Sequence, residues 1–170
     1  MSKNTIKKNK GSLTVEVLIV ASIMATSFLA ITTVAQKSIQ VSRQSLHILQ
    51  ASFLLEEGAE AVRSVRDDLW TNISSLLTTT TYYLNFNTTS SKWGLSTTAN
   101  TSGIFTREVT IAPVYRDNTS YNILASQCNP TTTCFLDSET KLIKITASWP
   151  EGGNPLPIKK EVSFYLAKIF

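Results

Sequence analysis

The strongest constraint on the fold is an apolar run near the N-terminus, residues 12–35, that is long enough to cross a bilayer as a helix. About 20 residues suffice for this at a rise of about 1.5 Å per residue. By the positive-inside rule the Lys-rich stretch before the run stays in the cytoplasm, so the rest of the chain is expected outside the cytoplasmic membrane. One carboxylate, Glu16, interrupts the run, and it would cost about 3 kcal/mol if charged at the bilayer centre.

The helical pattern continues beyond the apolar run, over residues 36–70. Apolar side chains recur there three, four or seven residues apart, which predicts an amphipathic continuation of the helix. No proline occurs between residues 12 and 70, so a single helix of roughly 85 Å is expected. One small domain cannot bury a helix of this length. We therefore expect lipid to cover the first half and a folded head to pack on the second.

The positive charge of the chain lies in its first eleven residues. The formal net charge is +4, and Lys3, Lys7, Lys8 and Lys10 account for all of it, because the other 12 basic residues are balanced by 12 acidic residues. A neutral remainder without a basic, aromatic-lined stripe argues against a nucleic-acid partner.

The residues around Gly11 resemble a known processing signal. The stretch Lys10-Gly11-Ser12-Leu13-Thr14-Val15-Glu16 is similar to the class III signal of type IV prepilins and pseudopilins. The resemblance implies that a prepilin peptidase removes a basic leader, residues 1–11, by cutting between Gly11 and Ser12, and that Ser12 is then N-methylated. It also implies that an inner-membrane pilus assembly platform joins the helix of residues 12–35 to other pilin subunits in a filament core. In that family the glutamate matching Glu16 guides assembly by attracting the N-terminal amine of a neighbouring subunit.

Electrostatics is compatible with this role for Glu16. Cleavage creates an α-amino group at Ser12, and pairing of the two charges offsets part of the cost of burying each. The alternative is a single-pass anchor whose glutamate reaches up to the membrane surface. Many family members begin with Phe and carry a kinking Pro, whereas this chain has Ser12 and no Pro in the helix. Hydroxyl groups that bond to helix carbonyls remain as a source of bending.

Residues 51–70 also resemble a segment of PilV-like minor pilins, through the pattern Glu-Gly-x-Glu-Ala-x-Arg-x-x-Arg-Asp. The candidates for contacts with neighbouring subunits are Glu56, Glu57, Arg63 and Arg66. The alternative is a solvated helix face with intrahelical pairs, Glu60 with Arg63 and Arg63 with Asp67, each worth a few tenths of a kcal/mol.

Residues 71–102 are rich in Thr, Ser and Asn, which predicts an extended surface loop. Four Asn-x-Ser/Thr sequons occur in the chain, but a Thr-rich composition produces them by chance, so glycosylation is not predicted. The sequons begin at Asn72, Asn87, Asn100 and Asn118.

Residues 103–170 alternate between apolar and polar side chains, as strands do. Three such segments are centred on Val109, Ile145 and Phe164, and the last two flank a Pro- and Gly-rich stretch that suits a hairpin loop. The expected fold is α+β and type IV pilin-like: one long N-terminal helix packed on a small antiparallel sheet of three to four strands.

Two cysteines, Cys128 and Cys134, are close in sequence within a polar segment. Outside the cytoplasm this spacing favours a small disulfide loop, with a pair of free thiols as the alternative.

The sequence gives no reason to expect an enzyme. Its one histidine, His47, lies in the predicted helix and is interpreted as a helix-face residue. No nucleotide-binding, hydrolase or metalloprotease motif occurs, so neither a cofactor nor a catalytic residue is predicted. Asp137 and Glu139 are too few for calcium, which takes six to eight oxygen ligands, so no metal site is predicted.

The function that these features favour is a minor type IV pilin, held in the cytoplasmic membrane before assembly and extracellular in a pilus afterwards. Adhesion, motility and DNA uptake are all open as roles of that pilus. A pseudopilin of a type II secretion or competence system is the alternative, because it shares the leader and the helix. A membrane-anchored extracellular binding module or adhesin is a further one.

Overall fold

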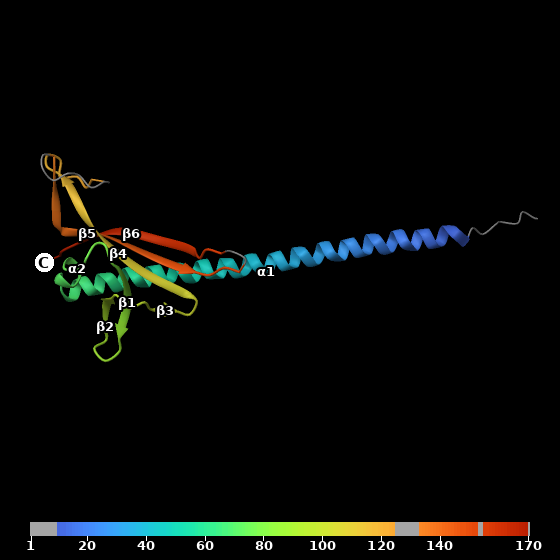
Figure 1. The fold of residues 1–170 in the computed structure, drawn as a ribbon, viewed down its shortest axis with the longest axis horizontal. Coiled ribbons are helices and arrows are strands. Elements are labelled where there is room, and N and C mark those ends of the chain that lie inside the picture. The colour runs from blue at the N-terminus through green and yellow to red at the C-terminus, as the bar shows by residue number, and fades with distance from the viewer. Residues whose placement is uncertain (1–9, 125–132, 153–154, 170) are drawn as a thin grey trace, which may run out of the picture. The chain divides into compact units, whose positions relative to one another are not determined.

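Helix α1 (Lys10–Asp68) is the longest element of a computed structural model that describes residues 10–124, 133–152 and 155–169 (Figure 1). It is a single helix of 59 residues and ends two residues before the predicted boundary. For residues 10–12 only the backbone is described. The chain divides into two compact units, Met1–Leu46 and His47–Phe170. We call the second unit the head.

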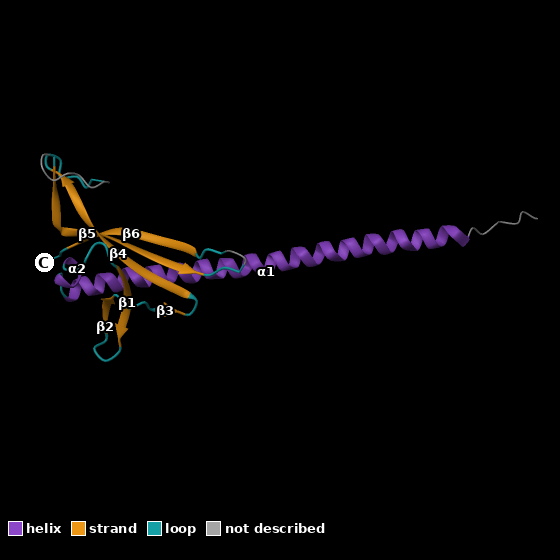
Figure 2. Ribbon diagram, in the orientation of Figure 1, coloured by secondary structure: helices purple, strands orange, loops and turns teal. Residues whose placement is uncertain are grey.

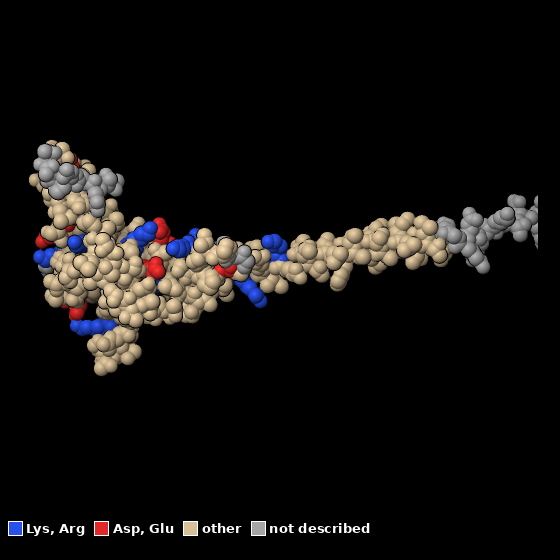
Figure 3. Space-filling view, in the orientation of Figure 1, with Lys and Arg blue, Asp and Glu red and all other residues tan. Residues whose placement is uncertain are grey.

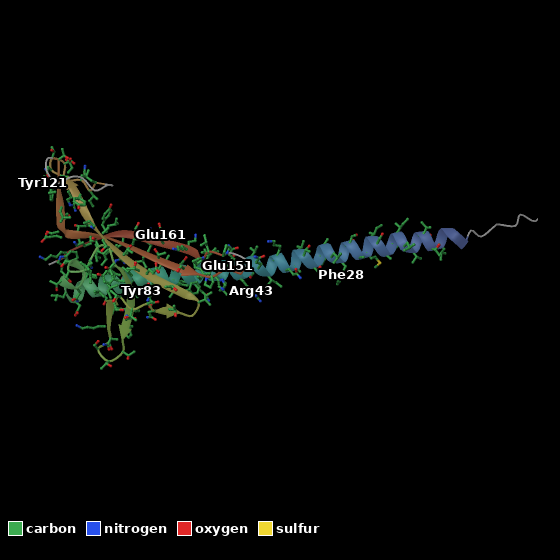
Figure 4. All side chains as sticks on the ribbon, in the orientation of Figure 1. Phe28, Arg43, Tyr83, Tyr121, Glu151 and Glu161 are labelled. Carbon is green, nitrogen blue, oxygen red and sulfur yellow. The ribbon has the colours of Figure 1, made fainter. Side chains whose placement is uncertain are left out.

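The described part of the first unit is an exposed apolar helix. Each large apolar side chain between residues 13 and 34, such as Phe28 in Figure 4, has at least half of its surface exposed. Figure 3 shows no blue Lys or Arg side chain along this stretch, and the first ones on α1 come between it and the head. Its most apolar window has a mean hydropathy of 2.2, so by length and composition the helix can cross a membrane. A long apolar N-terminal helix compatible with membrane anchoring is therefore present, as the sequence predicts.

Hydroxyl groups within this apolar stretch donate to helix carbonyls. Ser22 Oγ donates to the carbonyl of Ile19 at 2.8 Å, and Ser27 Oγ donates to that of Ile23 at 2.7 Å. The hydroxyls of Thr26, Thr32 and Thr33 do the same one turn back. The predicted back-bonding is therefore confirmed, and these polar side chains need no water, which suits a segment placed in lipid.

Among the described residues of the head, six strands form one antiparallel sheet (Figure 2). They are β1 (Thr81–Asn87), β2 (Lys92–Ser96), β3 (Thr101–Ser102), β4 (Phe105–Asp117), β5 (Cys134–Trp149) and β6 (Ile158–Ala167). The order is β2-β1-β4-β5-β6, and the short β3 pairs with the start of β4. The predicted α+β arrangement of helix and antiparallel sheet is confirmed, and so is the antiparallel pairing of the last two strands.

The prediction of three to four strands is wrong, because the sheet has six. The extra strands lie in residues 71–102, which the sequence predicted as a surface loop and which contain the short helix α2 (Thr71–Ser74), β1, β2 and β3. Tyr82 and Leu84 of β1 are buried in the core, so this segment is part of the folded head. Its Tyr-x-Leu-x-Phe alternation over residues 82–86 is a strand pattern that the Thr- and Asn-rich composition obscured.

The core of the head lies between one side of α1 and one face of the sheet. The fully buried helix side chains include Ala51 and Val62, and the sheet contributes Ile143, Ile145 and Trp149. All of these belong to one apolar cluster. Its buried members all come from residue 51 onward, so the apolar stretch of the first unit contributes none of them.

Beyond the main sheet, β4 and β5 continue as a two-stranded arm. The register between them shifts after Pro113, where Val114 pairs with Asp137. Asp137 accepts a hydrogen bond from Arg116 Nε at 2.6 Å and another from the backbone N–H of Glu139 at 3.0 Å. Burial raises the pKa of Asp137, but these bonds and one from the Thr140 hydroxyl outweigh it, so the pKa is lowered from its ordinary value. Asp137 therefore holds the two strands together by hydrogen bonds at the bulge where the arm begins.

Candidate assembly site

The predicted cleavage site lies at the N-terminal end of the described part of α1. Lys10 is the first residue that the structure describes, and the Gly11–Ser12 peptide bond lies within the helix.

Glu16 lies one turn further along, on an otherwise apolar side of the helix. A shallow surface strip is lined there by Glu16 together with Leu13, Val17, Val20, Ala21 and Met24. Glu16 is the only ionisable residue between residues 13 and 36. None of the ion pairs among the described residues includes it. Within the part of the chain that the structure describes, the first unit thus carries an exposed carboxylate with no cation beside it, on an otherwise apolar stretch of helix.

In the head, the predicted contact residue Glu57 forms an ion pair within its own chain. Its carboxylate lies 3.3 Å from Nη1 of Arg107, a β4 residue whose side chain is only 12% exposed. The same Nη1 donates to the backbone carbonyl of Leu54 at 3.1 Å, and the guanidinium lies over the Trp93 ring at 5.6 Å. Arg107 therefore joins α1 to strands β2 and β4. The sequence did not single out Arg107, because Arg107 and Leu54 are 53 residues apart in the chain.

Gly58 allows this close approach of helix and sheet. A Cβ atom at this position would lie 3.2 Å from Cδ of Arg107 and 3.3 Å from Cγ2 of Ile145. Both distances are tighter than ordinary van der Waals contacts, so a side chain here would force these two side chains to shift by a few tenths of an ångström. The glycine within the helical Glu-Gly-x-Glu pattern thus has a packing role.

The two predicted arginines also have partners within the head. Arg63 forms the predicted ion pair with Glu60, and its guanidinium lies 5.3 Å from the centre of the Phe164 ring. The predicted pair of Arg63 with Asp67 is replaced, because Asp67 accepts from Arg66 Nε at 2.8 Å. These contacts favour the interpretation of a salt-bridged helix surface for three of the four candidates.

Glu56 differs from the other three candidates. It is exposed, and no ion pair among the described residues includes it. Of the four candidates, only Glu56 has no ion-pair partner among the described residues. It therefore remains a candidate for contact with a neighbouring subunit.

The single histidine has a carboxylate neighbour that the sequence did not reveal. His47 Nδ1 lies 3.6 Å from Glu151, which follows β5 and also accepts from Trp149 Nε1 at 3.0 Å. The His47 ring meets the Phe105 ring edge to face, with 6.2 Å between centroids. The predicted helix-face position is correct, but this side chain is a packing contact between α1 and the end of β5.

The predicted disulfide involves a residue outside the described part of the chain. Cys134 begins β5 and is 2% exposed, whereas Cys128 lies outside the described residues. The pairing of the two stays a prediction. Among the described residues no group of three or more His, Cys, Asp or Glu is arranged to hold a metal ion. Asp137 pairs with Arg116, and Glu139 pairs with Lys168.

Comparison of the chain with protein-family models, with curated proteins and with solved structures finds no match.

Proposed function

We propose that this chain is the precursor of a minor pilin-like subunit, cut between Gly11 and Ser12 and assembled through α1 into an extracellular filament. In this account the leader directs the head across the membrane, and the apolar part of α1 holds the subunit there until assembly. Prepilin peptidase, the assembly platform and other pilin subunits are its partners.

The observation that supports the proposal is an apolar stretch of helix that contributes no side chain to the core of the head. The core of the head is complete from residue 51 onward, whereas the large apolar side chains of residues 13–34 are all at least half exposed. Burial of such side chains is worth about 25 cal/mol per Å² of apolar surface, so a partner outside the chain must cover them. Lipid covers them before assembly, and neighbouring helices cover them afterwards.

Glu16 distinguishes this account from a plain anchor. A membrane anchor gains nothing from a carboxylate on its apolar side, since the charge costs a few kcal/mol in the bilayer. A filament subunit gains a specific partner, because cleavage creates a positive amine at Ser12 of each copy. In a water-poor helix bundle, pairing of that amine with Glu16 of a neighbour sets the axial register of the two helices.

The proposal is tested by the location of the chain in the cells that produce it. Filaments sheared from the cell surface should contain the wild-type chain, as detected by an antibody against the head. Gly11→Val, which blocks the small-residue position before the cut, should keep the chain in the membrane fraction. Recovery of equal amounts of both chains in the sheared filaments would refute processing at Gly11.

The same fractionation separates a pilus subunit from a pseudopilin. A pilus subunit is recovered in long sheared filaments, whereas a pseudopilin stays with the cell envelope and its loss blocks secretion or DNA uptake without loss of surface filaments.

A further inference from the structure

Two cations follow the apolar stretch of α1. Residues 17–36 contain no ionisable side chain, and Lys37 and Arg43 are the first charged residues after them. Both are exposed, and Figure 3 shows blue side chains on α1 where the apolar stretch ends. Both belong to the first unit, Met1–Leu46, and their surroundings are therefore described within that unit alone.

No carboxylate in the described part of this unit lies near the two cations in sequence. After Glu16 the next acidic residue of the chain is Glu56, which belongs to the head. None of the ion pairs among the described residues includes Lys37 or Arg43. The described helix of the first unit thus ends with two positive charges that no ion pair neutralises.

The positions of the two cations along the helix match a bilayer surface. At about 1.5 Å per residue, residues 17–36 are about 30 Å long, which is the thickness of the hydrocarbon core. Lys37 then lies at the boundary of that core, and Arg43 lies about 9 Å further along the axis. The headgroup layer on each side of the core is about 5–7 Å thick, so the two cations lie on either side of it.

The Lys37 side chain turns away from the apolar stretch. Helix side chains lean towards the N-terminus, which for Lys37 is the direction of the bilayer centre. Its Nζ instead donates to Oε1 of Gln40, three residues further along the helix, at 3.4 Å. A lysine at the hydrocarbon boundary bends in this way to keep its ammonium group among the headgroups. Arg43 (Figure 4) starts beyond the headgroup layer, so the ordinary lean directs its side chain back towards the same layer.

We propose that Lys37 and Arg43 bind the phosphate groups of anionic phospholipids, in the leaflet at the C-terminal end of the apolar stretch. Positive charge without a carboxylate favours an anionic lipid, because the amine of a zwitterionic headgroup competes with the side chains for the phosphate. The adjoining apolar stretch favours a lipid over a soluble anion, since the acyl chains of the same molecule cover that stretch. The inference goes beyond the proposed function, because a plain membrane anchor would use the same site.

Photo-crosslinking in nanodiscs tests this site. The purified full chain is placed in nanodiscs made of three parts phosphatidylcholine and one part phosphatidylglycerol. A diazirine amino acid replaces Ile39, which is 56% exposed and lies between the two cations in sequence. Mass spectrometry identifies the headgroups of the lipids attached to the probe, and we expect phosphatidylglycerol at least threefold above its share of the bilayer. The same probe at Phe28, within the apolar stretch, is the control and should report the bulk share.

Two double variants separate charge from position. Lys37→Gln with Arg43→Gln removes both charges and should return the Ile39 probe to the bulk share. Lys37→Arg with Arg43→Lys keeps both charges and should keep the enrichment. Lys159→Gln with Lys160→Gln, at exposed positions of β6, is the control for net charge and should leave the enrichment unchanged.

Three results would overturn the inference. They are a bulk share of phosphatidylglycerol at the Ile39 probe of the wild-type chain, enrichment that persists after both cations become glutamine, and cross-links to a second copy of the chain in place of lipid. The nanodiscs contain no peptidase, so each of these results leaves the proposed cut at Gly11 to its own test.

Discussion

At the scale of single residues, two positions in α1 are each informative about their surroundings. Glu16 is a carboxylate on an apolar helix surface without a cation beside it among the described residues. Gly58 is the opposite case, because it lies in a helix where two side chains of the sheet leave little room for a Cβ atom. Each makes a prediction about a single substitution.

Glu16→Ala should leave cleavage intact and impair incorporation into filaments. In the proposed account the cut at Gly11 precedes the carboxylate, and assembly depends on the attraction between Glu16 and an N-terminal amine. We expect at least a tenfold decrease of the chain in sheared filaments, measured by immunoblot against the membrane fraction. Glu16→Gln is the matched control for size and polarity, and it should fail as well because the charge is what matters. Normal incorporation of both variants would contradict the role given to the carboxylate.

Gly58→Val should destabilise the head by about 2 kcal/mol, since extra volume in a close-packed contact costs about 1–3 kcal/mol. Gly58→Ala should cost less, because alanine recovers about 1 kcal/mol of helix propensity. Gly152→Ala is the control, as nothing lies within 4 Å of a Cβ at Gly152. Thermal unfolding of the detergent-solubilised chain, followed by near-ultraviolet circular dichroism, measures all three. Equal midpoints for the valine variant and the wild type would show that Gly58 has no packing role.

At the scale of elements, β1 and β2 show that the sheet begins earlier in the chain than the sequence predicted. The sequence predicted β4, β5 and β6 because their apolar residues alternate over longer stretches. It missed β1 and β2 because each is short and surrounded by Thr, Ser and Asn, which are also common in loops. Burial of Tyr82 and Leu84 against the rest of the head stabilises this segment as a strand. Such burial depends on residues distant in sequence, so the local sequence does not reveal it.

Leu84→Ala should therefore destabilise the head by about 2–5 kcal/mol, the usual cost of removing a buried leucine side chain. Leu84 is 2% exposed, and Leu77 in the same Thr-rich segment is 67% exposed. Leu77→Ala is thus a matched control, and it should change the free energy of unfolding by less than about 0.5 kcal/mol. The two variants would behave alike if residues 71–102 were a surface loop.

The stability of the arm of β4 and β5 should depend on pH through the ionisation of Asp137. Its pKa is lower in the folded chain than its ordinary value, so the carboxylate adds stability above that value, and this stability is lost as the pH falls through the folded pKa. Asp137→Asn should flatten the decline of the unfolding midpoint between about pH 5 and pH 3. Arg116→Gln should act in the same direction, because it removes the donor at 2.6 Å. Parallel pH profiles for wild type and Asp137→Asn would contradict this account.

At the scale of the whole molecule, the sequence names candidate site residues but not the contacts that surround them in the head. Gly11, Ser12 and Glu16 stand out as candidates because a Lys-rich stretch, a glycine and a glutamate lie close together before and within the apolar run. The ion pair of Glu57 with Arg107 and the contact of Arg63 with the Phe164 ring were not recognisable, because Arg107 and Phe164 are distant in sequence from α1 and approach it only when the sheet forms. The His47–Glu151 contact was missed for the same reason. Local motifs thus indicate processing, whereas the fold determines which charges remain available for neighbours.

The central claim is that the chain functions only after the bond between Gly11 and Ser12 is cut. The most direct measurement is the intact mass and N-terminal peptide of the protein isolated from its own cells. The account predicts a chain that starts at Ser12, with or without an N-methyl group. A chain that retains Lys7, Lys8 and Lys10, or one cut beyond residue 30, would contradict it.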